Sequence, residues 1–316
     1  TFKPVTALAA LSHDVVTARE TVYDPGYFKL PGRSKPLYEM FAPHGHGSIS
    51  LQRAIQVSCD VYFWTVGTRL KSDQLLETAN LVGLGGPVRV EAGPFGALTV
   101  NPGGVASPES ERKYHPKDLP FTTGDLANAV IGQGDNQFTT VSMAQMAATI
   151  ATRGTRFVPY IVQALQLPDH TPAWEAKPQP ILDAKTIPTR YYDTVRSGML
   201  AGATQPSGTS YDTFHDFAQR SGQLLGRAIQ VAGKTGTAET GGGVPDAWYI
   251  AFAPYDKPEV AVAVWVENGS SGAHAAAPVA RAILEAYFGM DAASAAARAQ
   301  AGQADVQNGS GPTTAR

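Results

Sequence analysis

The 316-residue sequence contains a single cysteine, Cys59, which excludes a disulfide framework within the chain and a four-cysteine zinc site. Neither sign of charge is in excess: 25 Lys and Arg residues stand against 27 Asp and Glu, for a net charge of -2. Nucleic-acid binding requires a basic surface, so we expect no nucleic-acid partner. No apolar run is long enough to span a bilayer, and no signal peptide opens the sequence.

The sequence begins with Thr1-Phe-Lys-Pro4 and without Met, which we interpret as a fragment whose targeting or anchoring segment would precede Thr1. Hydrophobic residues make up 43% of the chain and charged residues 16%, a composition that supports a substantial core. The last part is different, because Ala, Gly, Gln and Ser dominate it. We therefore expect one domain over residues 1–290, lacking its N-terminal start, and a disordered tail over 291–316.

Apolar residues recur at helical spacing in several segments and predict helices there. These segments are 3–13, the stretch from Ser50 onward, 73–81, 141–153, 187–201 and 275–288. Gly and Pro predict loops or irregular structure between them, at 20–48 (a loop with short extended pieces), 92–120, 128–134 (a turn-rich element) and 166–188 (a proline-rich connector). Residues 228–238, 247–253 and 260–267 predict consecutive strands with short links, and hence an antiparallel sheet in an α+β fold.

Two stretches suggest an activated serine. A serine hydroxyl is a poor nucleophile and needs a base within hydrogen-bond reach, and residues three apart on a helix share one face. If Lys3 ends an S-x-x-K motif, it would serve a serine placed directly before Thr1, provided that burial or a nearby cation keeps the lysine neutral. In the second stretch, Ser58 would relay a proton, and Asp60 would orient a lysine or a substrate amide.

The third stretch is Lys234-Thr-Gly-Thr237, in a predicted strand. Lys234 is the candidate cation near the base, and Lys234 and Thr235 would hold a substrate carboxylate. If the strand is an open edge, a peptide can add to it as an extra strand, and Gly236 permits close approach. The Thr237 N–H would then contribute to an oxyanion hole, where one donor is worth roughly 3–4 kcal/mol of barrier.

Each stretch alone is a weak signal, and a lone Lys-Thr-Gly occurs by chance. Their combination matches the S-x-x-K, S-D-N and K-T-G motifs of penicillin-binding proteins and class A β-lactamases. From Thr1 to about Phe288 the chain resembles the transpeptidase domain of class B penicillin-binding proteins, most of all the elongation-type penicillin-binding protein 2 group. The words that carry the resemblance are Thr1-Phe-Lys-Pro4, Asp24-Pro-Gly-Tyr-Phe-Lys-Leu-Pro-Gly32, Gly45-His-Gly47, Ser58-Cys-Asp-Val-Tyr-Phe63, Ile131-Gly-Gln-Gly134, Lys234-Thr-Gly-Thr-Ala-Glu239, Ala247-Trp-Tyr-Ile-Ala-Phe-Ala-Pro254 and Ala275-Ala-Ala-Pro278.

The resemblance implies a transpeptidase fold shared with serine β-lactamases, with a five-stranded antiparallel sheet flanked by helices. It implies serine acyl transfer from D-Ala-D-Ala stem peptides of peptidoglycan in cell-wall elongation, without a cofactor, and trapping by β-lactams. It makes Lys3 the base, Ser58 the relay, Lys234 the electrostatic partner, and Thr235, Gly236 and Thr237 substrate-binding residues. It also implies a place on the outer face of the cytoplasmic membrane, an anchor before Thr1, and elongation-complex partners that contact the region before Thr1.

Two departures from the family pattern matter. The expected nucleophile is not in the sequence, so this exact chain is expected to be inactive. The second motif ends in Asp60 where the pattern has Asn. A serine β-lactamase or a β-lactam sensor domain is an alternative, although no clear deacylating glutamate is visible. A non-catalytic scaffold is another, although Lys3, Ser58 and Lys234 are all retained.

A metal site is a further alternative. Asp24, His44, His46 and Cys59 are residue types that zinc favours. Some members of the resembled family bind zinc, but their ligand positions find no match here. Histidines in a Gly-rich loop are more often plain loop residues, so we expect no metal.

Overall fold

A computed structural model describes residues 1–316 except for 40–43, 102, 118–119, 242, 295 and 297–316, so nearly all of the expected tail lies outside the described residues. Its main sheet is antiparallel, in the order β11 (Ala232–Ala238), β12 (Asp246–Ala253) and β13 (Val260–Val266). The three predicted strands and their antiparallel arrangement are confirmed. The described residues place three strands in this sheet, and the five-stranded form stays a prediction.

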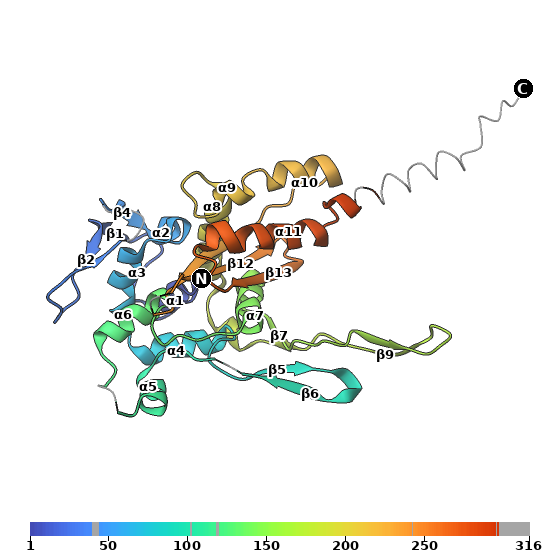
Figure 1. Ribbon diagram of the computed structural model, residues 1–316, viewed down its shortest axis with the longest axis horizontal. Helices are drawn as coiled ribbons and strands as arrows, with labels where there is room; N and C mark the ends of the chain where they lie inside the picture. The colour runs from blue at the N-terminus through green and yellow to red at the C-terminus, as the bar shows by residue number, and fades with distance from the viewer. Residues whose placement is uncertain (40–43, 102, 118–119, 242, 295, 297–316) are drawn as a thin grey trace, which may run out of the picture.

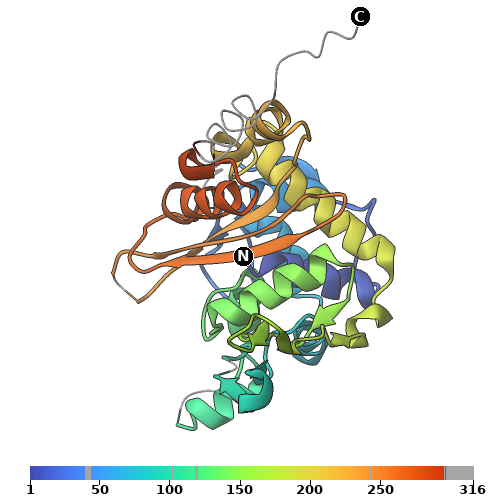
Figure 2. The same cartoon turned by 90° about the vertical axis from the view of Figure 1, so that its right-hand side faces the viewer.

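The sheet lies between two layers of helices (Figures 1 and 2). Successive side chains of a strand point to opposite faces. Ile250 and Phe252 accordingly join the core of the helical region, where α7 (Thr140–Ala151) and α8 (Thr189–Thr204) pack against the sheet. Tyr249 and Ala251 join a second core under α11 (Ala277–Tyr287). One sheet therefore holds two apolar cores together.

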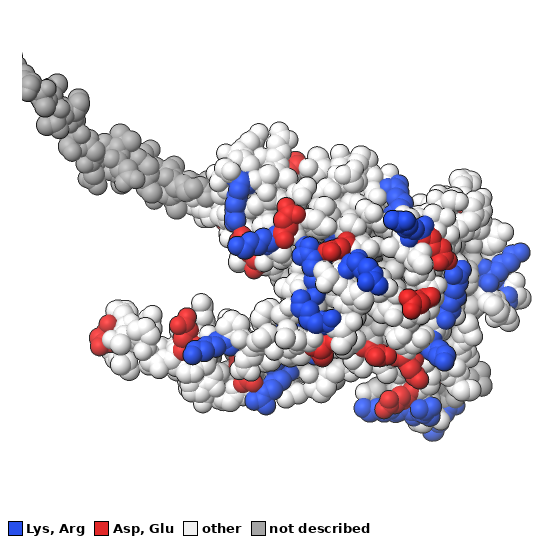
Figure 3. All heavy atoms as spheres, turned by 180° about the vertical axis from the view of Figure 1, so that it is seen from behind, with Lys and Arg blue, Asp and Glu red and all other residues white. Residues whose placement is uncertain are grey.

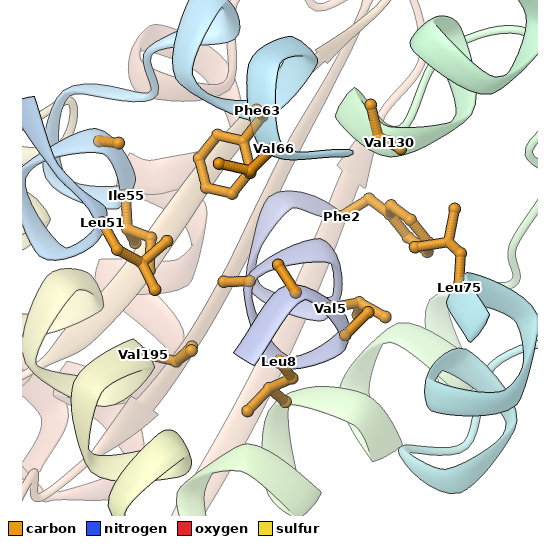
Figure 4. Close-up of a cluster of buried hydrophobic side chains, with 14 of the residues drawn as sticks. Phe2, Val5, Leu8, Leu51, Ile55, Phe63, Val66, Leu75, Val130 and Val195 are labelled. Atoms are coloured by element: carbon orange, nitrogen blue, oxygen red, sulfur yellow. The ribbon is translucent and has the colours of Figure 1, made fainter. Parts of the chain in front are cut away.

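Helix α1 (Lys3–Ser12) runs through the middle of the helical region, and every residue from Lys3 to Leu11 is buried. Figure 4 shows Phe2, Val5 and Leu8 surrounded by apolar side chains of other helices. A helix that is apolar all round needs such enclosure. The side chain of Lys3 is thus carried into the interior by the packing of the helix that bears it.

The other helices follow the sequence closely at some places and depart from it at others. They are α2 (Leu51–Val57), α3 (Asp60–Gly67), α4 (Ser72–Leu81), α5 (Pro108–Tyr114), α6 (Thr123–Ile131), α9 (Tyr211–Phe214) and α10 (Phe217–Leu225), with short η1 (Gly93–Phe95), η2 (Asp183–Thr186) and η3 (Gly272–Ala276). The turn-rich element expected at 128–134 is wrong in its first half, which is the end of α6. Its glycines terminate a helix, because Gly132 takes the left-handed C-cap position.

The remaining strands form two-stranded pairs. They are β1 (Thr21–Asp24) with β4 (Gly47–Ser50), β2 (Tyr27–Phe28) with β3 (Leu37–Tyr38), β5 (Val88–Glu91) with β6 (Ala97–Val100), β7 (Arg156–Phe157) with β10 (Pro180–Ile181) and β8 (Ala164–Gln166) with β9 (Pro172–Glu175). The β5–β6 and β8–β9 hairpins project from the body (Figure 1). The short extended pieces expected within 20–48 are confirmed, whereas the segments 92–120 and 166–188, expected to be irregular or a connector, also contain paired strands.

Figure 3 shows the same hairpins from behind, standing away from the main body, with basic and acidic side chains interspersed over that face. Among the described residues, no helix has the length and hydropathy needed to span a membrane.

Candidate active site

Ser58 occupies a sharp junction between two helices. It ends α2 in the left-handed conformation, with φ 61°, and the next residue, Cys59, caps α3. The left-handed conformation is costly for a residue with a side chain. Here it turns the chain so that the Ser58 hydroxyl meets amines from two other elements, α1 and β11.

Lys3 reaches the same point from the first turn of α1. Its Nζ donates hydrogen bonds to the Ser58 carbonyl at 2.6 Å and to the Ser58 Oγ at 2.9 Å. It also forms an ion pair with Asp60 Oδ1 at 2.6 Å. The three residues predicted from two separate motifs therefore meet in one cluster.

Lys234 completes the cluster from β11. It is 1% exposed, and its Nζ donates to the Ser58 Oγ at 2.8 Å and to the Thr235 carbonyl at 2.9 Å. Burial lowers the pKa of Lys234 well below its usual value, the charge of Lys3 lowers it further, and Asp60 partly opposes both effects. Burial therefore favours the neutral form of Lys234.

The edge of β11 forms one wall of the site. The Gln133 Nε2 donates to the Thr237 carbonyl at 3.0 Å, so this carbonyl points away from β12. In an antiparallel pair the N–H and C=O of one residue point to the same side, and the Thr237 N–H therefore also faces away from β12. The side-chain hydroxyl of Thr235 donates to Thr209 Oγ1 at 2.8 Å.

Gly236 is in close contact with the start of α1. A Cβ at this position would lie 2.7 Å from the backbone nitrogen of Thr1, a distance that real Cβ atoms do not show. The backbone entering α1 therefore passes directly against β11. A residue placed immediately before Thr1 would stand beside Gly236, one helical turn from Lys3.

These residues line a single cleft with a volume of about 540 Å³. Such a volume is within the range of small-molecule and cofactor sites. All predicted site residues except Lys234 itself are among its lining residues, and the Lys234 amine lies behind Ser58. The lining includes Thr1, Lys3, Ser58, Asp60, Thr235, Gly236, Thr237, Asn128, Gln133, Thr209, Trp248 and His274.

Reasoning from the sequence did not predict several cleft residues, and two of them, Thr209 and Gln133, form hydrogen bonds with residues of the Lys234–Glu239 stretch. Thr209 lies on the loop after α8, where no motif marks it. Gln133 follows the C-cap glycine of α6, and its side chain accepts a hydrogen bond from the Glu239 N–H at 3.2 Å as well as donating to Thr237. The segment Ile131-Gly-Gln-Gly134 was recognised in the sequence, but nothing in it indicated that the side chain of Gln133 reaches β11.

A second buried polar cluster lies on the other side of the Ser58–Asp60 segment. One ligand atom each from Asp24, Glu39, His46 and Cys59 lies within 4.8 Å of the others. His44 is exposed and outside this group, and Glu39 takes the place that sequence reasoning gave to His44. One thiol, one imidazole and two carboxylates are a donor set that suits zinc, so these four residues could hold such an ion.

Burial and hydrogen bonds shift the pKa values of Asp24 and Cys59 in this second cluster. Burial raises the pKa of Asp24, but hydrogen bonds from Gly26, His46 and Cys59 outweigh it, and the pKa is lowered. Burial, and then the charge of Glu39, raise the pKa of the Cys59 thiol. The thiol donates to Asp24 Oδ2 at 3.3 Å. A metal ion would have to displace this proton.

Glu39 links the two clusters. Its Oε2 accepts from the Asp60 N–H at 2.8 Å and from the Val61 N–H at 3.3 Å, at the start of α3. Burial raises the pKa of Glu39, and the nearby Asp60 raises it further. The carboxylate thereby fixes the backbone of Asp60, whose side chain holds Lys3.

The comparison with known families gives one result for most of the chain. The model of the penicillin binding protein transpeptidase domain matches residues 1–285. A peptidoglycan D,D-transpeptidase MrdA of Haemophilus influenzae is 29% identical over 305 residues, which are 91% of this chain and 44% of that protein. A peptidoglycan D,D-transpeptidase PbpA of Mycobacterium tuberculosis is 33% identical over 297 residues, 90% of this chain and 54% of that protein. The chain spans about half the length of these relatives.

Solved structures agree. Penicillin-binding protein A of M. tuberculosis, as a ceftriaxone acyl-enzyme, superimposes with a TM-score of 0.70 at 31% identity, covering 90% of this chain and 59% of that chain. A chain from a peptidoglycan synthase complex that coordinates polymerization and crosslinking gives a TM-score of 0.75 at 27% identity, covering 92% of this chain and 46% of that chain.

Proposed function

Because the chain belongs to the penicillin binding protein transpeptidase family, we propose that it is the greater part of the catalytic domain of a peptidoglycan D,D-transpeptidase of cell-wall elongation, inhibited by β-lactams. The observation that carries this proposal is the meeting of Lys3, Ser58 and Lys234 at one hydroxyl beside the β11 edge. The names of the relatives, peptidoglycan D,D-transpeptidase MrdA and PbpA, support the substrate class.

The proposed nucleophile is a serine directly before Thr1. Its hydroxyl attacks the carbonyl carbon of the penultimate D-Ala, the peptide C–N bond breaks, and D-Ala leaves with a proton on its new amine. An ester joins the serine oxygen to the peptide. An amine of a second stem peptide then attacks the ester carbonyl, and the serine oxygen regains a proton as the cross-link forms.

The lysine pair supplies the proton transfers. In the structure Lys3 donates to the Ser58 Oγ, and Ser58 can in turn donate to Lys234, whose neutral form is favoured by burial. A shift of one proton along this path leaves Lys3 neutral and Lys234 charged. Lys3 can then accept the proton of the serine, and Ser58 can deliver a proton to the departing amine.

The β11 edge binds the reacting carbonyl and the carboxylate in this proposal. The Thr237 N–H faces the cleft and is the proposed oxyanion donor. Thr235, which lines the cleft, is the proposed contact of the D-Ala carboxylate, and Lys234, buried behind it, supports that carboxylate through its charge when protonated. We assign the whole protein to the outer face of the cytoplasmic membrane. Its partners would include other proteins of a peptidoglycan synthase complex, in line with the structural match to a chain from such a complex.

The test is intact mass after incubation with benzylpenicillin, on the protein with serine before Thr1 and on the same protein with alanine there. One penicilloyl adduct on the serine form alone is the expected result. Absence of an adduct on the folded serine form would favour a non-catalytic scaffold. Steady turnover of a chromogenic β-lactam, in place of one slow-to-clear adduct, would favour a β-lactamase.

A further inference from the structure

The cleft has two walls of different character. The β11 wall carries polar groups that are assigned above to the donor peptide, among them Thr235 and the Thr237 N–H. A second wall, on the α3 side of Ser58, is formed by the side chains of Leu37, Tyr38 and Trp64, which we call the aromatic wall. The proton transfers and donor contacts proposed above use none of these three side chains.

The packing of α3 against the β2–β3 hairpin builds the aromatic wall. Trp64 lies one helical turn after Asp60, and residues four apart share one face of a helix. Its indole is 5% exposed and stacks on the Phe28 ring of β2, with ring centroids 6.3 Å apart. Leu37, on the paired strand β3, packs against the same core. The wall is therefore formed before any substrate arrives.

Tyr38 stands at the exposed end of this wall. Its side chain is 69% exposed, and its ring lies 6.5 Å from the ring of Tyr27 on the paired strand. The next residue, Glu39, accepts a hydrogen bond from the Asp60 N–H at 2.8 Å. The hairpin is thereby fixed to the start of α3. The aromatic wall extends from the neighbourhood of Asp60 outward to solvent at Tyr38.

A transpeptidase must bring a second substrate to the same acyl carbon. Attack by the acceptor amine is the reverse of departure of the D-Ala amine, so the acceptor nitrogen must arrive where the D-Ala nitrogen left. In the proposed mechanism that place is beside the Ser58 hydroxyl. The donor peptide occupies the edge of β11, and the aromatic wall offers the acceptor a route to Ser58 that does not cross this edge.

The chemistry of the wall suits an amine at the end of an aliphatic chain. Apolar side chains favour methylene groups, and each fully buried methylene strengthens binding by about 4-fold. The ring faces of Trp and Tyr attract an ammonium ion. The Asp60 carboxylate lines the cleft one helical turn from Trp64, at the end of the wall nearest Ser58.

We propose that the aromatic wall is the acyl-acceptor subsite, and that it selects acceptors whose primary amine ends an aliphatic side chain. The amine nitrogen bonds to the acyl carbon, and the bond between the serine oxygen and that carbon breaks. Of the two protons that the ammonium ion loses, one goes to the serine oxygen and the other to solvent. The inference rests on the proposed transpeptidase function, because it concerns the second half of that reaction.

The experiment measures how the acyl-enzyme partitions between water and two amines of similar basicity, methylamine and Nα-acetyl-lysine amide. The full-length protein with serine before Thr1 is acylated by a thioester analogue of the donor, and the products are quantified by mass spectrometry. We expect the native protein to prefer the lysine derivative by about 10-fold or more, the value of about two buried methylenes. In Tyr38→Ser this preference should fall about 3- to 5-fold.

Tyr23→Ser is the matched control. Tyr23 lies on β1, is also 69% exposed, and is not among the residues that line the cleft. This variant should keep the native preference between the two amines. Benzylpenicillin labelling of each variant verifies that the site is folded.

Three outcomes would overturn the inference. One is a native protein without a preference for the lysine derivative. Another is a Tyr38→Ser protein that keeps the native preference. The third is a Tyr38→Ser protein that loses reaction with both amines equally relative to water. Failure of the native protein to form an acyl-enzyme with either the thioester or benzylpenicillin would instead count against the transpeptidase function.

Discussion

Two buried polar clusters flank the segment Ser58-Cys59-Asp60, and they have opposite character. On one side, two lysine amines meet at the Ser58 hydroxyl. On the other, the carboxylates of Asp24 and Glu39 lie close to the imidazole of His46 and the thiol of Cys59. Consecutive residues serve different clusters, since Ser58 and Asp60 face the amines and Cys59 faces the acids. Buried charges of one sign need the opposite charge close by. Here the segment Ser58-Cys59-Asp60 joins the lysine cluster to the acidic cluster.

The largest expected effect comes from removing one of the two amines at the Ser58 hydroxyl. Lys234→Met keeps most of the side-chain volume but removes the charge and both hydrogen bonds. In the protein that carries a serine directly before Thr1, we expect the second-order rate of benzylpenicillin acylation to fall by about 10²- to 10⁴-fold, the contribution of a positioned acid–base group. The exposed Lys257→Met is the control and should react normally. A Lys234→Met protein that reacts at the native rate would remove Lys234 from the mechanism.

The acidic cluster is tested by its metal content. If the four residues hold zinc, purified native protein should contain about one ion, and Cys59→Ser should bind it about 10²-fold more weakly or not at all, because a hydroxyl is a poor substitute for a thiolate. Elemental mass spectrometry and chelator-dependent melting measure this. His44→Gln is the matched control outside the cluster. Native protein that carries no metal and melts identically with and without chelator would contradict the site.

The link between the clusters is tested at Asp60. Asp60→Asn keeps the shape but removes the ion pair with Lys3 at 2.6 Å. It also restores the asparagine of the family pattern. In the protein that carries a serine directly before Thr1, we expect acylation to fall about 10-fold through loss of Lys3 positioning, with a shift in the pH profile of kcat/KM that a purely structural effect would not produce. An unchanged profile would mean that Asp60 only stabilises the fold.

The smallest effect concerns stability against pH. Because the pKa of Lys234 is lower folded than unfolded, the unfolded state binds more protons between that lowered value and about 10.4, the unfolded pKa of lysine. Stability from this group therefore rises with pH across the window, by at most about 1.4 kcal/mol per pH unit. Urea unfolding at several pH values should show a flatter curve for Lys234→Met. If stability depends on pH in the same way in the native protein and in Lys234→Met, the pKa of Lys234 in the folded protein lies near its ordinary value.

The sequence predicted the parts of the fold that have a clear apolar pattern. Helices α1, α7 and α11 carry apolar residues at helical spacing, and β12 and β13 are nearly continuous apolar runs. The structure confirms these elements, and it confirms β11, which was predicted from the stretch that contains its Lys-Thr-Gly motif. Helices α9 and α10 lie in a segment for which no element was predicted, and the segment 166–188 contains paired strands where a connector was expected. Short, exposed pairs such as β8–β9 bury little, so they leave little apolar pattern to read.

The site was predictable where local motifs carry it. Lys3, Ser58, Asp60 and Lys234 come together as their motifs suggest. Glu39 and Gln133 were missed because their parts depend on tertiary packing, a carboxylate under the start of α3 and an amide against β11. A side chain that forms hydrogen bonds with the backbone of a distant element produces no motif or periodic pattern in the sequence.

The enclosure of α1 has a consequence for how the proposed activity would be lost on heating. Water can reach the amide hydrogens of a helix buried on every side only when the domain opens as a whole, so those of α1 should exchange with solvent among the slowest in the chain. Lys3 stands at the start of that helix. Heat inactivation and global unfolding should therefore coincide, with no partly opened species that still reacts with penicillin.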